Sequence, residues 1–168
     1  MSKFYKSITR EQAELINKSV LFFVASADPK LAGGPDGVGP VNVSPKGGVP
    51  LHILSPNRVA YLDYPGSGNE TARHAKAGGP ITVMVPCFEG ENAAIVRLYG
   101  KATVTKLDDS PIAGRLLEKA ATEMGPAARQ VIDVEVTSTM TSCGYGVPVL
   151  EFARERKKSD RGRLYKDT

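Results

Sequence analysis

Short runs of apolar and β-branched residues, separated by turn residues, recur along the chain and restrict the fold more than any other feature. Most gaps between these runs are too short for a crossover helix, so consecutive strands pair as antiparallel neighbours. We expect a mainly β (α+β) fold of about six strands with a few short flanking helices, in a barrel or sandwich rather than a sheet of βαβ units. The runs are residues 20–27, 41–44, 49–54, 58–63, 81–87, 93–107 and 131–136.

Local signals refine this outline. Thr9 to Gln12 forms a capping box that opens a short amphipathic helix ending near Lys18. Gly100 interrupts the long alternating run and indicates a bulge or a barrel corner. The sequence Pro45-Lys46-Gly47-Gly48 predicts a turn after the 41–44 run, and Asp109-Ser110-Pro111 predicts the start of a later helix, with proline at its first position.

Composition limits the class of protein. A chain of 168 residues suits one domain, and no apolar run reaches the roughly 20 residues that span a membrane. The first residues lack the apolar core of a signal peptide, and Cys87 and Cys143 are far apart, so we expect a cytoplasmic protein without disulfides. His52 and His74 are the only histidines and lack partner ligands at suitable spacing, so no metal site is expected.

The net charge of +4 comes from the last 16 residues, 153–168, which hold seven basic and three acidic side chains. A solvated helix, or a set of cations beside an anionic ligand, is favoured for this tail. A nucleic-acid-binding arm is disfavoured, because the tail has one aromatic residue and interleaved acids.

The segment from Tyr61 to Lys76 reads as a strand, a glycine-bearing turn and the first turns of a helix, which is an arrangement that can hold phosphate. Ser67 and Glu70 fit a capping box, and Asn69 is the competing N-cap, so the helix is expected to start within two residues of Gly68. The alternative for this segment alone is an ordinary capped helix.

Lys46 follows the end of the 41–44 run, in Ser44-Pro45-Lys46, and its ammonium group can complement a phosphate there. The alternative is an exposed lysine in a hairpin turn. Signatures of α/β-hydrolases, zinc proteases, P-loop proteins and nicotinamide-binding domains are missing from the sequence. No catalytic residue is assigned.

Five segments in this order, FFVASA, VNVSPKG, RVAYLDYPGSGNETARH, ITVMVP and RLYGKATV, resemble the FMN-binding split-barrel superfamily, and within it the pyridoxamine 5'-phosphate oxidase-like proteins. The resemblance covers Thr9 to Phe152. It implies a six-stranded antiparallel split barrel that forms a homodimer with FMN in clefts between the protomers. By position, the resemblance places three residues along the flavin ring, Asn42, Val43 and Ser44. It places five around the phosphate, Lys46, Ser67, Asn69, Thr71 and Arg73. Tyr61 and Leu62 would lie beside the ribityl chain.

The end of the chain is similar to the end of the oxidase itself but departs from it. Ala153 stands where the oxidase has tryptophan, and Tyr165 stands where it has the histidine that, with an arginine matched here by Arg163, contacts the substrate. The resemblance therefore supports FMN more strongly than pyridoxamine 5'-phosphate as substrate.

The expectation is an FMN-binding domain over residues 1–152, with residues 153–168 as a basic tail of the same domain. Its function would be FMN-dependent oxidation or reduction of a small organic substrate. The alternative is a non-catalytic flavin or haem carrier or sensor on the same barrel, and a deazaflavin could replace FMN.

Overall fold

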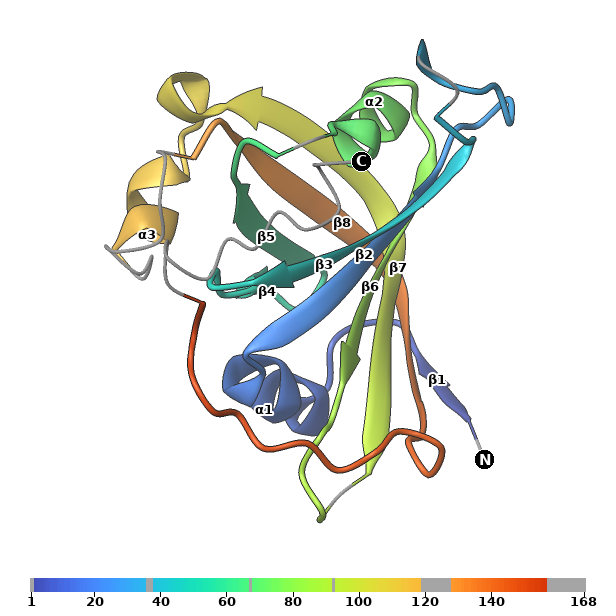
Figure 1. Cartoon of the computed structure of the whole chain (residues 1–168), viewed down its shortest axis with the longest axis vertical. Coiled ribbons are helices and arrows are strands. Elements are labelled where there is room, and N and C mark those ends of the chain that lie inside the picture. Colours follow the sequence, from blue (N-terminus) through green and yellow to red (C-terminus); the bar gives the residue numbers. More distant parts are fainter. Residues whose placement is uncertain (1, 36–37, 67, 92, 119–127, 157–168) are drawn as a thin grey trace, which may run out of the picture.

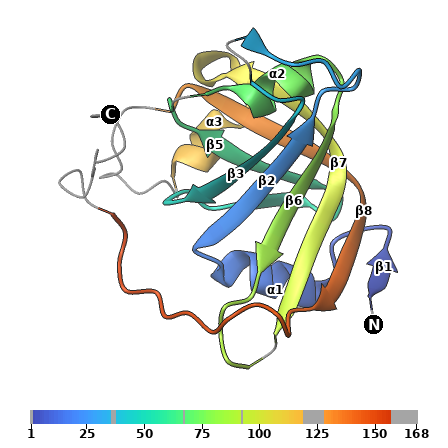
Figure 2. The ribbon, with the colours of Figure 1, turned by 45° about the vertical axis from the view of Figure 1, so that its right-hand side comes forward.

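A curved antiparallel sheet forms the body of the protein in a computed structural model, which describes residues 2–35, 38–66, 68–91, 93–118 and 128–156 (Figures 1 and 2). The strand order is β3-β2-β6-β7-β8-β5-β4, with β1 on β8. The end strands β3 and β4 do not pair, so the barrel stays open on that side. The elements are β1 (Lys3–Tyr5), α1 (Arg10–Lys18), β2 (Leu21–Ala27), β3 (Val41–Gly47), β4 (His52–Ser55), β5 (Arg58–Asp63), α2 (Glu70–Lys76), β6 (Pro80–Pro86), β7 (Ala94–Lys106), α3 (Ala113–Leu117) and β8 (Gln130–Cys143).

The expected mainly β split-barrel architecture is confirmed, but the sheet has eight strands among the described residues rather than about six. The strand β1 has three residues, which is too short to show a two-residue period, and it pairs with the end of β8. Strand β8 itself continues seven residues beyond its expected end at Val136, through a polar stretch of threonines and serines. Pairing with long β7 along its whole length allows these weakly apolar residues to remain in the sheet.

Strand β3 corrects the expected turn at Pro45. The strand runs from Val41 through Pro45 and Lys46 to Gly47, and the chain turns only at Gly48, whose φ of 68° favours glycine. Proline is tolerated within this strand because β3 pairs with β2 alone and is therefore an edge strand. Lys46 consequently projects from a strand and not from a hairpin turn.

Of three other local predictions, two are confirmed and one is wrong. The capping box of α1 is present, and the register shifts at Gly100, where an added Cβ would collide with the backbone oxygen of Glu135. The helix expected at Pro111 instead begins at Ala113. A 3₁₀ turn, Leu107–Asp109, precedes it, and the bond from the Ala113 N–H to the Ser110 carbonyl makes the proline part of a turn.

Alternate residues of the strands fill the interior of the barrel. The main core joins residues from β2, β5, β6, β7 and β8, and Phe22 packs edge-on against Tyr61 with ring centroids 5.3 Å apart. Full burial of such a side chain contributes about 1.5–3 kcal/mol. A smaller cluster around Leu62 and Leu116 packs α3 against β5. The two clusters hold the end of β5 rigidly at the open side of the barrel.

Candidate functional site

A buried carboxylate, Asp63, ends β5 at this open side and binds three donors. Its side chain is 6% exposed and accepts hydrogen bonds from Lys46 Nζ at 2.8 Å, Arg129 Nε at 3.0 Å and Gln130 Nε2 at 2.8 Å. Lys46 comes from β3, Gln130 is the first residue of β8 and lies opposite Asp63 in the register, and Arg129 directly precedes it. Side chains from β3 and from the start of β8 therefore converge on the end of β5.

The electrostatics of this cluster leave an excess of positive charge. Burial would raise the pKa of Asp63, but hydrogen bonds from Lys46, Gln130 and Arg129 together hold its pKa below the ordinary value. The carboxylate is therefore ionised at neutral pH and faces the basic side chains of Lys46 and Arg129. Asp63, Lys46 and Arg129 together have a net charge of +1, which suits an anionic ligand.

The same cluster fixes the turn before α2. Arg129 Nη2 donates to the Gly68 carbonyl at 3.0 Å, and Gln130 Nε2 donates to Asn69 Oδ1 at 2.8 Å. Asn69 is the N-cap of α2, as one of the two alternatives predicts, but its side chain makes no capping bond because its oxygen is engaged by Gln130. Ser67 lies outside the described residues.

Neutral donors from β3 and α2 lie beside this cluster. Asn42 Nδ2 donates to Ser44 Oγ at 3.0 Å and to Thr71 Oγ1 at 3.2 Å. Side chains alternate across a strand, so Asn42, Ser44 and Lys46 share the inward face of β3. Val43 points the other way and is 62% exposed, so the structure separates it from the two polar residues that flank it.

Arg73 occupies a second group of contacts on α2. Its guanidinium lies 3.4 Å from Asp28 Oδ2 and 2.9 Å from His74 Nε2. An added Cβ at Gly34 would lie 3.0 Å from the guanidinium carbon, so the loop after β2 closes over this side chain. Backbone N–H groups of Lys30 and Ala32 lower the pKa of Asp28 and keep it ionised.

Tyr61 and Leu62 are buried in the two cores, so their side chains support the site from beneath. The phenol of Tyr61 has no hydrogen-bond partner among the described residues, and burial followed by the nearby Asp63 raises its pKa. It remains a neutral group at physiological pH. Lys46 Nζ lies 5.7 Å from the centre of its ring, within the range of a cation–π contact.

Three residues of the cluster were missed by sequence reasoning: Asp63, Arg129 and Gln130. A carboxylate at the end of an otherwise apolar run is an available signal, because an acidic residue is seldom buried without a partner. The partners are 66 and 67 residues away and are brought there by strand pairing, so the sequence alone does not identify them.

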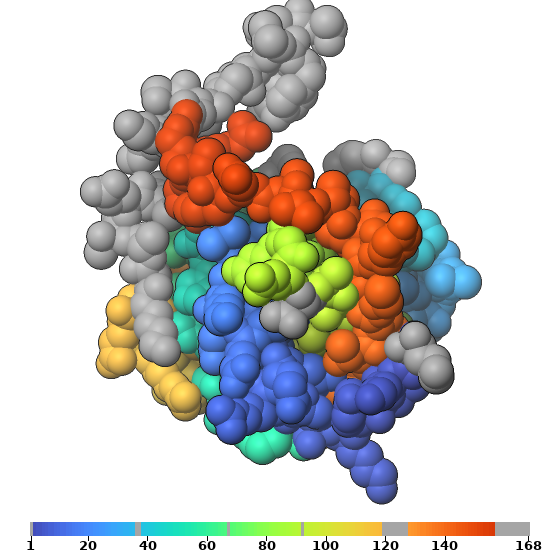
Figure 3. Space-filling model, turned by 90° about the horizontal axis from the view of Figure 1, so that it is seen from below, coloured from blue at the N-terminus to red at the C-terminus, as the bar shows by residue number. Residues whose placement is uncertain are grey.

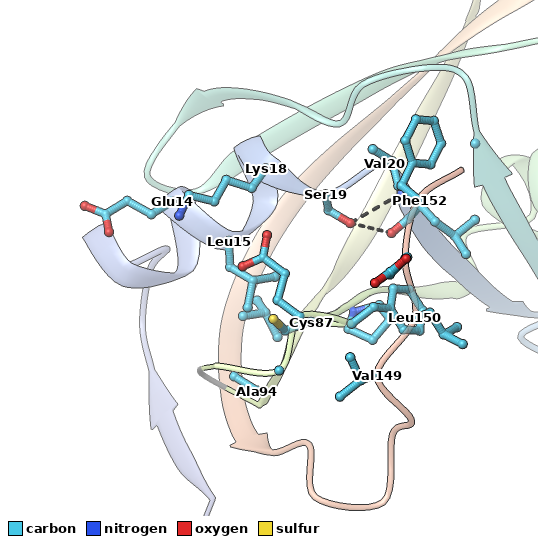
Figure 4. A pocket seen from close by; sticks show the side chains of 18 of the residues that line it. Glu14, Leu15, Lys18, Ser19, Val20, Cys87, Ala94, Val149, Leu150 and Phe152 are labelled. Atoms are coloured by element: carbon cyan, nitrogen blue, oxygen red, sulfur yellow. Dashed lines mark hydrogen bonds between the residues drawn. The ribbon is translucent and has the colours of Figure 1, made fainter. Parts of the chain in front are cut away.

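A separate pocket of about 1170 Å³ lies between α1, the β6–β7 turn and the residues after β8 (Figure 3). Its apolar lining includes Leu15, Val20, Leu150 and Phe152, which Figure 4 shows around the opening. It meets β3 only at Gly47, and of the residues expected at the phosphate, those that the structure describes do not line it.

Two further absences apply to the described part of the chain. It contains no group of three histidine, cysteine or acidic side chains arranged to hold a metal ion. None of the helices assigned within it has the length and apolar character needed to cross a bilayer.

Comparisons with known proteins show what the chain is similar to. No protein-family model matches it. Over 155 residues it is 35% identical to the pyridoxamine 5'-phosphate oxidase family protein ustO of Aspergillus flavus, in a match that covers 90% of this chain and 58% of ustO. The chain thus spans a little over half the length of this curated relative.

Solved structures agree on the fold. A protein of Lactobacillus delbrueckii, provisionally named a pyridoxamine 5'-phosphate oxidase, superposes with a TM-score of 0.57 at 21% identity, over 80% of this chain and 94% of that chain. An FMN-binding protein of Syntrophomonas wolfei gives 0.50 at 14% identity, over 75% and 85%. The chain is therefore similar in sequence to a pyridoxamine 5'-phosphate oxidase family protein, and it shares its fold with these solved structures.

Proposed function

We propose that this protein binds FMN at the open side of its barrel and acts as an oxidoreductase on a small organic substrate. The observation that carries the proposal is the convergence of Lys46 and Arg129 on the buried carboxylate of Asp63, which holds two cations in place with one charge in excess. A phosphate dianion is the ligand that such a site attracts most strongly.

The donors around this point fit a phosphate ester. Lys46 and Arg129 supply charge, and the hydroxyl of Thr71 supplies a neutral hydrogen bond, while Asn42 and Ser44 are proposed to lie along the flavin ring. The carboxylate of Asp63 already accepts three donors, which reduces its repulsion of an anion. In our proposal Asn69, Arg73 and Ser67 complete the phosphate site, and Val43 contacts the flavin ring from the outer face of β3.

Bound flavin would supply the hydride or electron chemistry, and the chain would bind and orient it. Tyr61 and Leu62 act through the stiffness of β5, on which Asp63 is placed. The similarity to ustO and the FMN-binding name of the Syntrophomonas protein support a flavin that carries phosphate.

We also propose a homodimer that completes the flavin site. Val41, Val43 and Pro45 form an exposed apolar stripe on the outer face of the edge strand. The segment after β8 adds exposed Val149 and Phe152. Exposed apolar groups of this extent mark an association surface, and obligate interfaces usually bury more than about 2,000 Å².

Binding can be tested by titrating flavin-free protein with FMN and with riboflavin, which lacks the phosphate, and following flavin fluorescence. Lys46→Ala and Arg129→Ala should each weaken FMN binding about tenfold, because charge-assisted hydrogen bonds are worth roughly 1.5–3 kcal/mol, and should leave riboflavin binding unchanged. Lys101→Ala, at an exposed position on β7, is the control. Equal losses for both flavins would exclude the phosphate assignment.

Catalysis is tested separately from binding. Anaerobic reduction of the bound flavin by candidate donors, followed at its visible absorption band, distinguishes an oxidoreductase from a non-catalytic flavin or haem carrier. Pyridoxamine 5'-phosphate is expected to be a poor substrate, because Ala153 is exposed where the oxidase has tryptophan. The other departures, at Arg163 and Tyr165, lie outside the described residues. Rapid turnover of this compound would contradict the substrate expectation while leaving FMN binding in place.

A further inference from the structure

A fully buried imidazole, His74, lies directly behind the Arg73 guanidinium on α2. Its Nε2 is 2.9 Å from Arg73 Nη2, and its Nδ1 is 2.9 Å from Ser26 Oγ on β2. Ser26 is buried as well, whereas the Arg73 side chain is 29% exposed, so the Ser26 contact is the one fully shielded from bulk water. Both ring nitrogens therefore have defined partners inside the protein.

The chemistry of these partners determines where the ring proton lies. A guanidinium carries only donors, so Nε2 must be the acceptor of the Arg73 bond. The proton of the neutral ring then lies on Nδ1 and points at Ser26. Protonation of Nε2 would point its N–H at the N–H of Arg73 Nη2 and place the imidazolium beside the guanidinium. The present geometry therefore requires the neutral ring.

The charged surroundings favour the same state. The pKa of His74 is lowered first by burial and then by Arg73, against the opposing effects of Asp28, the Ser26 backbone and Glu70. Strands β6 and β7 also pack against α2. No charged residue occurs in β6, and Lys101 of β7, opposite Pro80 in the register, is exposed.

We infer that His74, as the neutral Nδ1–H tautomer, is a positioning residue that fixes Arg73 for an anionic ligand and makes that binding sensitive to acid. The inference rests on the proposed function only for the identity of the anion as the FMN phosphate. Asp28 and Gly34 confine the guanidinium from the other sides, so loss of the Nε2 acceptor leaves Arg73 with an ion pair of 3.4 Å and a neighbouring positive charge.

The first test measures FMN affinity from pH 8 to pH 5 in the wild type and in His74→Gln. Glutamine keeps an acceptor near the position of Nε2 but does not titrate. The phosphate's own second ionisation, with a pKa of about 6, weakens binding equally in both proteins. Between pH 7.5 and pH 5 the wild type should therefore lose about tenfold more affinity than the variant. Riboflavin should show no such difference.

The second test uses the unaltered protein. Long-range ¹H–¹⁵N spectra distinguish the two imidazole tautomers, and the chain has only two histidines, so the spectrum of His74→Gln assigns the signals. The Nδ1–H form at pH 7.5 supports the inference, whereas the Nε2–H form or a charged ring overturns it.

The outcomes separate this inference from the proposed function. If Arg73→Ala leaves FMN affinity unchanged, the role of Arg73 in the proposed site fails, and the inference fails with it. If Arg73→Ala weakens FMN binding about tenfold while the wild type and His74→Gln keep parallel pH profiles, the proposed site stands and the positioning role of His74 is refuted.

Discussion

The polar cluster at Asp63 and the segment after β8, residues 144–156, differ in how many of their side chains find partners within one chain. At the cluster, one buried carboxylate accepts three donors from β3 and β8. In the segment, Val149, Leu150 and Phe152 are 65%, 55% and 57% exposed. A hydrogen bond from Leu150 N to the Phe88 carbonyl, 3.0 Å long, joins the segment to the barrel. One region is organised in advance by folding, whereas the other has apolar surface that folding leaves uncovered.

The largest effect on stability is expected when Asp63→Ala removes the carboxylate from the cluster. Lys46 and Arg129 would then remain close together without their shared counter-ion, and loss of one partner of a buried ion pair costs about 3 kcal/mol or more. Urea denaturation measures this change in the free energy of unfolding.

The matched control is Asp133→Ala. Asp133 pairs with Arg58, whose side chain is 47% exposed, and removal of such a surface pair should cost less than about 1 kcal/mol. Similar losses in the two variants would show that Asp63 has no special place in the fold.

The uncovered surface can be tested with Val43→Asp on the outer face of β3. The side chain is exposed in one chain, so folding should be affected by less than about 0.5 kcal/mol, while a charge buried in the proposed dimer interface should weaken association by at least about tenfold. Sedimentation velocity across a concentration series gives the dissociation constant.

Phe4→Asp serves as the control for the dimer, because Phe4 is 69% exposed but lies on β1. Equal weakening by both substitutions would remove the assignment of the interface to the β3 face.

A smaller effect is expected from acid acting on Asp63. Its folded-state pKa lies below the ordinary value of 3.8, so its ionised form contributes stability that is complete above pH 3.8 and is lost as the pH falls through the lowered pKa. The difference in melting temperature between the wild type and Asp63→Asn should therefore narrow between pH 5 and pH 2.5. A difference that stays constant over this range would mean that folding does not lower the pKa of Asp63.

The smallest effect concerns the attachment of the segment. Leu150→Pro removes the N–H that binds the Phe88 carbonyl and should accelerate tryptic cleavage after Arg154 severalfold, with a change in melting temperature below about 2 °C. Val149→Pro, at the adjacent position, is the control. Equal acceleration by both substitutions would show that the hydrogen bond does not hold the segment.

Local physics explains which features the sequence reveals. The capping box at Thr9, the strand Arg58–Asp63 and the bulge at Gly100 each depend on a few neighbouring residues, and the structure confirms them. The inward face of β3 follows from the two-residue period once the strand is known to continue through Pro45. That continuation depends on whether β3 lies at the edge of the sheet, which is a property of the whole topology.

The candidate site is less visible for the same reason. Lys46, Asn42 and Thr71 stand in recognisable motifs, but Asp63, which binds Lys46, takes its other two partners from positions more than 60 residues away. Burial of Tyr61 and Leu62 likewise follows from the assembled cores and not from their motif.

Pro45 also limits how further strands can add to the edge of the sheet. An edge strand that carries exposed Val41 and Val43 would ordinarily be a template on which further strands add without limit, as in a fibril. A proline within an edge strand is placed with its missing N–H on the open side, so the ladder of backbone donors is interrupted there. Side chains of β3 remain free to associate while continuous strand addition is blocked, which favours a closed pair of molecules over polymer growth.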